Sequence, residues 1–363
     1  MWLCAIYYNF ATQQLSNSAT QHTKAFIPAL WYKFQAMKNT FIALLAFLAL
    51  GCNDSDDGPT DENGSARDYK QDMRDLVIGI SQAAKAVKPN FAVIPQNGIE
   101  LVSGNGEAGG SPHTAYLAAI DGNGQEDLFY GYDNDDQATD PTQTAYLKAL
   151  LDVSKNAGKT LLVTDYASTA SKMTDSYQKN AAAGYVSYAA PHRSLDVIPT
   201  SEPHHANPDN ITSLGQARNF LYLINPEAYS SKAAFINAVT ATNYDAIIMD
   251  LFLNDEPFTA AEVAQLRSKA NGGKRLVICY MSIGEAEDYR YYWQDSWTGN
   301  KPGWMAAENP DWPGNYKVKY WDPQWQEILY KDQDSYLGRI TTAGFDGVYL
   351  DIIDAFEYFE EQE

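Results

Sequence analysis

Carboxylate residues recur where short apolar runs of this chain end. Asp250 and Asp351 lie at the ends of two such runs, and Glu100, Glu285 and Asp354 follow others within a few residues. Single acids in these positions are often only helix caps. Two carboxyl groups held close together behave differently, because their pKa values split and leave one group ionised and the other protonated. Hydrolysis of a glycosidic bond requires that combination.

The elements that must position these acids are apolar runs separated by amphipathic stretches. Each run is rich in β-branched or aromatic residues, as buried strands are. The runs cover residues 91–96, 128–132, 160–166, 185–190, 219–225, 244–252, 275–283 and 345–352. Residues 145–155 and 259–270 have helical periodicity, and glycines follow both stretches.

Alternation of this kind predicts an α/β fold, a (β/α)8 TIM barrel, with a doubly wound open sheet as the alternative. No G-x-G-x-x-G follows the first run, so no dinucleotide site is predicted. We expect the reaction to need no cofactor.

Active sites of (β/α)8 barrels lie at the carboxyl ends of the strands. The polar residues at these ends include Asn97, Glu100, Asp165, Asp250, Glu285, Arg290, Asp351 and Asp354. Glu126 comes just before the second run. Closure of the barrel would make the first and last strands neighbours, which would place Glu100 beside Asp351. We therefore expect these two residues to form the catalytic pair.

A segment rich in aromatic residues follows the seventh run. It contains Trp293, Trp297, Trp304, Trp312, Trp321 and Trp325. Aromatic rings can stack on the apolar faces of sugars, but they are also large contributors to a core. We expect most of these rings to pack the segment onto the barrel and one or two to be exposed.

The composition restricts the partners. The chain has 46 acidic and 26 basic residues, a formal net charge of −20, which argues against a nucleic-acid partner. An acidic surface suits a cationic or neutral ligand. With only five His and three Cys, neither a metal site nor a disulfide framework is expected.

The N-terminal region reads as a targeting segment. Residues 37–52, MKNTFIALLAFLALGC, have a basic start and an apolar stretch too short to span a bilayer. The end of this segment resembles a bacterial lipoprotein box, in which Cys52 would be lipidated. We therefore expect an over-extended start over 1–36 and a signal peptide over 37–51. An acidic tether over 52–68 and the barrel over 69–363 would follow.

These features predict an exported protein that is anchored to the bacterial cell envelope through a lipid on Cys52. The outer membrane or the cell surface is the expected location. We expect a polysaccharide substrate and a monomeric protein.

Two longer strings resemble a known family. Residues 279–290, CYMSIGEAEDYR, and 344–354, GFDGVYLDIID, are similar to glycoside hydrolase family 114, whose characterised members are endo-α-1,4-polygalactosaminidases. The hydrolase domain of the Pel polysaccharide protein PelA is a more distant likeness. In relatives the counterpart of 219–225 comes first and the counterparts of 93–100, 126–129 and 163–166 come last. The chain therefore resembles a circular permutant of the family barrel.

The resemblance implies roles for individual residues. Asp351 matches the strand-end nucleophile, and Glu100 matches the acid/base. The residues that would line the substrate groove are Glu126, Asp165, Asp250, Glu285, Tyr280 and Arg290. Many relatives have Trp-Pro-Gly-Glu where this chain has Asn315 after Trp-Pro-Gly.

The sequence predicts endo-cleavage of an α-1,4-linked amino-sugar polymer of the galactosaminan type. One alternative is a non-catalytic glycan-binding surface lipoprotein, which would need no close carboxyl pair. The other is a metal-dependent polysaccharide deacetylase, for which His204 and His205 would be among the few ligands. Adjacent residues on a strand or helix point apart, so we expect this pair to be solvated surface.

Overall fold

The computed structural model describes residues 67–362. Its centre consists of parallel strands: β1 (Ala92–Pro95), β2 (Gly122–Glu126), β3 (Thr160–Tyr166), β4 (Val186–Ala190), β5 (Phe220–Tyr222), β6 (Ala246–Met249), β9 (Leu276–Ser282) and β13 (Gly347–Asp351). Seven of these strands overlap the predicted runs, and β3 has the predicted bounds. The α/β class with parallel pairing is thereby confirmed.

The strands form two parallel sheets. One has the order β1-β13-β9-β6-β5, and the other has the order β2-β3-β4. A single parallel bridge between Gln96 and Gly124 joins β1 to β2, and β4 packs beside β5. The first and last strands are neighbours, since Ala92 to Pro95 pair with Gly347 to Leu350. The predicted adjacency of the chain's first and last strands is therefore confirmed.

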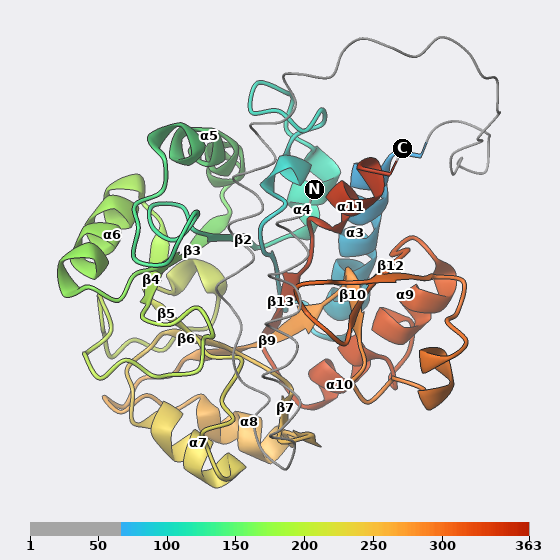
Figure 1. The fold of residues 1–363 in the computed structure, drawn as a ribbon. Coiled ribbons are helices and arrows are strands. Elements are labelled where there is room, and N and C mark those ends of the chain that lie inside the picture. The colour runs from blue at the N-terminus through green and yellow to red at the C-terminus, as the bar shows by residue number, and fades with distance from the viewer. Residues whose placement is uncertain (1–66, 363) are drawn as a thin grey trace, which may run out of the picture.

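Helices cover the outside of the strands (Figure 1). They are α3 (Tyr69–Val87), α4 (Thr114–Ala119), α5 (Pro141–Asn156), α6 (Ala170–Ala183), α7 (Lys232–Thr240), α8 (Ala260–Leu266), α9 (Pro323–Tyr330), α10 (Tyr336–Thr342) and α11 (Ala355–Glu360). Short 3-10 turns are η1 (Ile99–Val102), η2 (Leu214–Gln216) and η3 (Asp295–Thr298). The local sequence determines where several helices begin. Asp140 caps the N-terminus of α5 in front of Pro141, and Thr259 forms a capping box with Glu262 at the N-terminus of α8.

The second strand corrects the sequence prediction. The apolar run 128–132 is a loop, and the strand is the preceding Gly122–Glu126, which has no apolar side chain. The glycines explain this choice: a Cβ on Gly124 would lie 2.0 Å from the Tyr349 hydroxyl, and one on Gly122 would lie 2.9 Å from Leu214. The side chains of Tyr349 on β13 and Leu214 in η2 fill the space that β2 leaves.

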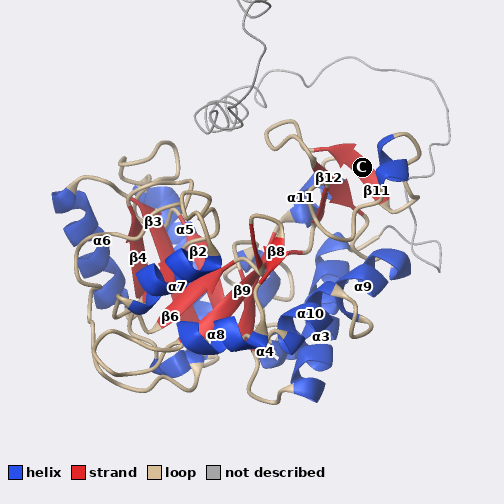
Figure 2. Ribbon diagram, turned by 90° about the horizontal axis from the view of Figure 1, so that it is seen from below, coloured by secondary structure: helices blue, strands red, loops and turns tan. Residues whose placement is uncertain are grey.

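Two small antiparallel sheets extend the strand ends. β10 (Glu285–Glu287), β11 (Met305–Glu308) and β12 (Asn315–Val318) form one with the order β10-β12-β11, beside α11 in Figure 2. β7 (Phe252–Leu253) and β8 (Glu256–Pro257) form the other. The first of these sheets follows β9 directly and carries Glu285.

The aromatic segment is largely structural, as predicted. Trp325 is fully buried and its ring N–H donates to the carbonyl of Ile283 at 2.9 Å. Trp304 packs against Trp325 with ring centres 5.0 Å apart, and Trp297 meets Trp304 edge to face at 5.2 Å. Trp312, at 60% exposure, is the tryptophan of the described residues that projects into solvent.

The targeting predictions lie outside the described residues. These are the start over 1–36, the signal peptide over 37–51, Cys52, and the tether up to residue 66. Within residues 67–362 no helix is both long enough and apolar enough to cross a bilayer.

Candidate active site

Three adjacent strands end in residues with left-handed backbone conformation. Asn97 after β1 has φ 57°, Asp127 after β2 has φ 59°, and Ile352 after β13 has φ 59°. For a β-branched residue such as Ile352 this conformation is rare and is strained by roughly 1–3 kcal/mol. The strained turns follow directly on Glu126 and Asp351, so they set the direction in which these two carboxylates leave the strands.

Asp351 is the last residue of β13 and is held from the neighbouring strand. The Tyr280 hydroxyl, on β9, donates to Asp351 Oδ2 at 2.5 Å. Burial raises the pKa of Asp351 to about 7, and the negative charge of Glu126 adds to the rise. The Tyr280 hydrogen bond opposes it by stabilising the carboxylate.

Glu126 is the last residue of β2 and is held by several donors. Its Oε2 accepts from Gln96 Nε2 at 2.5 Å and from Asn97 Nδ2 at 3.0 Å. Its Oε1 accepts from the Tyr166 hydroxyl. Gln96 is fixed in turn, because the buried Tyr222 hydroxyl donates to its Oε1 at 2.8 Å. The Glu126 carboxylate therefore has little freedom to rotate.

Glu100 is placed differently from the sequence prediction. It lies in η1, beyond the end of β1, and its Oε1 accepts from the Tyr146 hydroxyl at 3.0 Å. There it lines a cavity of about 270 Å³ together with Glu107 and Glu357. The structure thus brings Glu126, rather than Glu100, into electrostatic contact with Asp351.

A second polar group lies next to the pair. Burial raises the pKa of Asp354 to about 6, and the Lys317 ammonium counteracts part of this rise. Lys317 Nζ forms an ion pair with Glu285 Oε1 at 2.6 Å. Glu285 is fully buried on β10 and also accepts from Asn309 Nδ2 at 2.8 Å and from Asn315 Nδ2 at 3.3 Å. Asn315, the departure from the relatives, is therefore a partner of a predicted site residue.

Asp250 and Arg290 form an ion pair at the end of β6. Arg290 Nη1 donates to Asp250 Oδ2 at 2.7 Å, and its Nε donates to Glu287 Oε2 at 2.5 Å. Burial raises the pKa of Asp250, and the Arg290 charge opposes this. The arginine has two carboxylate partners, so its main effect is to fix β10 against the end of β6.

Asp165 does not line a groove. It is fully buried on β3 and accepts from the backbone N–H of Phe129 at 2.8 Å and of Tyr130 at 3.2 Å. Ser176 Oγ and Asn180 Nδ2 of α6 donate to its other oxygen at 2.6 and 3.0 Å. The carboxylate anchors the loop after β2 to α6, which corrects the predicted substrate-binding role.

Several residues at this site carry no signal in the sequence. Two of them, Gln96 and Tyr166, donate to Glu126 directly, and Tyr222 acts through Gln96. Each stands inside a run that has the composition of an ordinary buried strand. Alternation along β3 and β5 could have placed the two tyrosines on the inner face. Their contact with Glu126 depends on the register of β2.

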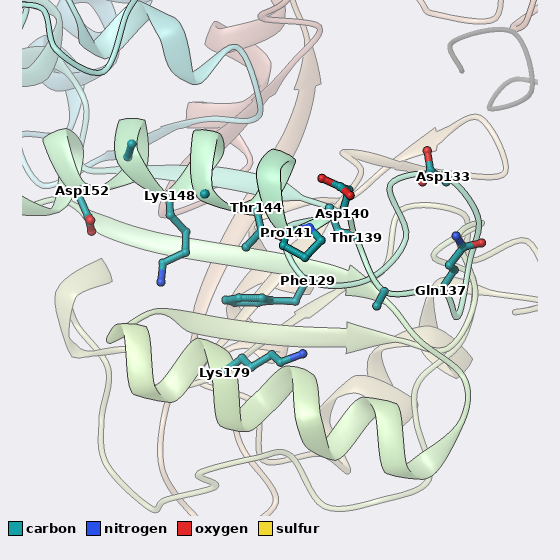
Figure 3. Close-up of a pocket in the computed structure, with 13 residues that line it drawn as sticks. Phe129, Asp133, Gln137, Thr139, Asp140, Pro141, Thr144, Lys148, Asp152 and Lys179 are labelled. Carbon is teal, nitrogen blue, oxygen red and sulfur yellow. The ribbon is translucent and has the colours of Figure 1, made fainter. Parts of the chain in front are cut away.

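A cavity larger than the one at Glu100 lies elsewhere. It has a volume of about 820 Å³ and lies between α5 and α6, with Lys148 and Lys179 on either side of Phe129 (Figure 3). None of the predicted site residues lines it. Within residues 67–362 no three His, Cys, Asp or Glu side chains are grouped as metal ligands. His204, one of the histidines considered for a deacetylase, instead stacks its ring on Tyr177 with ring centres 4.6 Å apart.

Carboxyl groups gather at the ends of β13 and β2, which flank β1, and hydrolases of glycosidic bonds use two carboxyl groups. The comparison with protein families agrees with this class. Residues 200–363 match the model described as Glycoside-hydrolase family GH114, so this segment is similar to glycoside hydrolase family 114. The matched segment includes Asp351, Tyr280 and Glu285.

Curated relatives are similar over shorter segments. An uncharacterized protein of Methanocaldococcus jannaschii, MJ1477, is 39% identical over 155 residues, which are 43% of this chain and 43% of that protein. Uncharacterized proteins of Deinococcus radiodurans and Thermotoga maritima are 46% and 52% identical over 123 and 85 residues, or 34% and 23% of this chain and 37% and 25% of theirs. The chain therefore spans less than half the length of the curated relatives it matches.

Proposed function

We propose that this protein cleaves an amino-sugar polysaccharide with Asp351 and Glu126 as its catalytic pair. The observation that carries the proposal is the coupling of these two carboxyl groups at strand ends that flank β1. Burial and the negative charge of Glu126 raise the pKa of Asp351 to about 7, so Asp351 holds a proton up to near-neutral pH, and the proposed reaction passes this proton to Glu126. The match of residues 200–363 to the family 114 model supports the reaction class.

The proposed reaction runs in two steps. With the proton of Asp351 transferred to Glu126, Asp351 Oδ attacks the anomeric carbon while Glu126 gives this proton to the leaving oxygen, so that the glycosidic C–O bond breaks and a covalent glycosyl–Asp351 ester forms. Glu126 then takes a proton from water, and the water oxygen displaces Asp351 from the sugar. Glu126 replaces Glu100 in the acid/base role, because Glu126 acts on Asp351 and is held by the side chains of Gln96, Asn97 and Tyr166.

The charge of the site supports a cationic substrate. The charges of Glu126 and Asp354 add to the raised pKa of Asp351, and that of Asp354 adds to the raised pKa of Glu357, while Lys317 already has Glu285 as its partner. Protonated amines on a partly deacetylated polymer would reduce this repulsion. We therefore propose an α-1,4-linked galactosaminan as the substrate and cleavage within the chain.

We propose further that the two parallel sheets are one closed, circularly permuted (β/α)8 barrel. The bridge between β1 and β2 and the packing of β4 beside β5 support closure. The family match over 200–363 begins shortly before β5 and ends after β13, which supports a chain order that starts in the middle of the family barrel.

The location remains a proposal from the sequence. We propose that Cys52 is lipidated and that the protein is exported as a monomer to the cell envelope, where it acts on polysaccharide and binds no nucleic acid. Metabolic labelling with a tagged fatty acid would test the anchor, because Cys52→Ser should abolish the label.

Release of new reducing ends from partly deacetylated α-1,4-galactosaminan tests the proposed function. The purified protein should release them, and Asp351→Asn and Glu126→Gln should each lose at least about 100-fold, the scale of a lost acid/base. Retained binding without release by the parent protein would indicate a glycan-binding protein. Release of acetate without new reducing ends, abolished by a chelator, would indicate a deacetylase.

A further inference from the structure

Arg193, in the loop after β4, binds a residue next to the catalytic pair. Its Nη2 donates to Asp127 Oδ1 at 2.8 Å and its Nη1 donates to Asp127 Oδ2 at 3.2 Å. Nη2 also donates to the carbonyl of Gly131 at 2.9 Å. This planar, two-point contact requires a guanidinium group, because an ammonium group cannot match both oxygens in the same way.

The same guanidinium lies on an aromatic ring of the site. Its central carbon is 3.8 Å from the centre of the Tyr166 ring, and the Tyr166 hydroxyl donates to Glu126 Oε1. Asp127, the other partner, follows Glu126 directly and has φ 59°. Arg193 therefore contacts two of the groups that orient Glu126: the turn at Asp127 that follows it, and the ring of Tyr166, whose hydroxyl binds it.

The loop after β2 is shaped around this contact. Gly131 has φ 119°, and a Cβ there would lie 2.1 Å from Asp127 Oδ1 and 2.9 Å from Arg193 Nη2. Thr139 Oγ1 donates to the carbonyl of Asp127 at 2.7 Å. The Asp127 side chain is only 8% exposed, so the ion pair is shielded from solvent and should be stronger than a surface pair.

We propose that Arg193 is a positioning residue for Glu126, acting through Asp127 and the Tyr166 ring. The inference rests on the proposed function, since it assigns Arg193 to the orientation of the acid/base. Arg193 itself touches no reacting atom. Its loss frees the turn at Asp127 and the Tyr166 ring together, and Glu126 then leaves the position at which it meets both the leaving oxygen and Asp351.

The test compares Arg193→Met, Arg193→Lys and Tyr166→Phe with the parent protein. Misplacement of a catalytic group by about 1 Å costs roughly 100-fold in rate, so Arg193→Met should lose about that factor in kcat with a smaller change in KM. Arg193→Lys should keep the charge but not the planar contact, and should restore only part of the activity. Arg218→Met is the matched control, because Arg218 is a 60% exposed arginine with one aspartate partner at 3.4 Å.

A second readout does not depend on hydrolysis. The carboxyl carbon of Asp351, observed by 13C NMR and assigned with Asp351→Asn, reports the distance of the Glu126 charge through its titration. Arg193→Met should shift this titration to lower pH, as Glu126→Gln should, while Arg218→Met should leave it unchanged. If the parent protein hydrolyses no amino-sugar polymer, the proposed function fails, and the titration still decides the role of Arg193.

The proposal is overturned by either of two results. One is a folded Arg193→Met protein with parental kcat and an unchanged Asp351 titration. The other is an Arg193→Met protein whose loss of activity equals its unfolded fraction, as measured by thermal denaturation. In that case the Asp351 titration would be unchanged and Arg193→Lys would recover full activity.

Discussion

At the scale of single residues, the chemistry depends on how Asp351 is protonated. Its pKa of about 7 is set by burial and by Glu126, and Tyr280 holds it down. The sequence could identify Asp351 and Tyr280, because both stand in strings with a recognisable pattern. It could not identify the partner, since Glu126 precedes an apolar run and reads as a residue before a strand rather than at its end.

The first prediction concerns the pH dependence of catalysis. Asp351 must be ionised to attack and Glu126 must carry a proton to donate, so kcat/KM should rise as the pH increases through about 7 and fall again once the pair has lost its last proton. Tyr280→Phe removes the hydroxyl that lowers this pKa, and the rise should move to higher pH. pH–rate profiles of both proteins measure this. Tyr185→Phe, which loses only a 3.3 Å hydrogen bond to Asp152, is the control, and an unmoved rise in Tyr280→Phe would contradict the account.

At the scale of elements, β2 shows where sequence patterns fail. Its residues are polar or glycine, because its inner face gives room to Tyr349 and its last residue serves the site. Hydrophobic periodicity detects strands that supply core side chains, and it therefore found β3 with the correct bounds and missed β2. The error displaced the predicted strand end to residue 132 and left Glu126 out of the predicted pair.

Gly124→Ala should therefore harm both stability and the site. The new methyl group would lie 2.0 Å from the Tyr349 hydroxyl, and overpacking of this kind costs about 1–3 kcal/mol of unfolding free energy. Denaturant unfolding should show the loss, and Tyr349→Phe in the same chain should recover part of it. Gly109→Ala is the control, since nothing lies within 4 Å of its Cβ position. Equal stability of the two alanine variants would disprove the packing argument.

The loop between β11 and β12 carries the next prediction. Trp312 is 60% exposed there, and its backbone carbonyl accepts from Asn315 N–H at 3.0 Å, next to the residues that hold Glu285. Stacking on an amino sugar would contribute about 0.5–1 kcal/mol, so Trp312→Ala should raise KM for the polymer roughly two- to fivefold at constant kcat. Val87→Ala removes a 71% exposed side chain from α3 and is the control. An unchanged KM would mean that Trp312 does not contact the substrate.

At the scale of the whole molecule, the order of the strands could be predicted from the sequence. Which side chains meet at the strand ends could be predicted only in part. Adjacency of the first and last strands followed from the count of strand–helix units. The strained residues Asn97, Asp127 and Ile352 did not, because left-handed backbone at a non-glycine residue leaves no mark in composition or periodicity. Asp165 looked like a rim acid and instead satisfies buried donors of the fold.

Stability of the whole molecule should depend on pH through the same carboxyl group. The folded-state pKa of Asp351 is raised from 3.8 to about 7. Its contribution to stability is therefore complete below about pH 3.8 and is lost as the pH rises through 7. Asp351→Asn should match the parent protein near pH 4 and unfold at a higher temperature than the parent at pH 8. Thermal unfolding at both pH values measures this, with Asp311→Asn as the control; a variant less stable than the parent at pH 8 would refute it.

The central claim is that Glu126, and not Glu100, is the partner of Asp351. The most direct measurement is the rate of reducing-end release from partly deacetylated α-1,4-galactosaminan by Glu126→Gln and Glu100→Gln, side by side with the parent protein. The account predicts a loss of at least about 100-fold in Glu126→Gln and less than about tenfold in Glu100→Gln. Full activity of Glu126→Gln together with an inactive Glu100→Gln would contradict it.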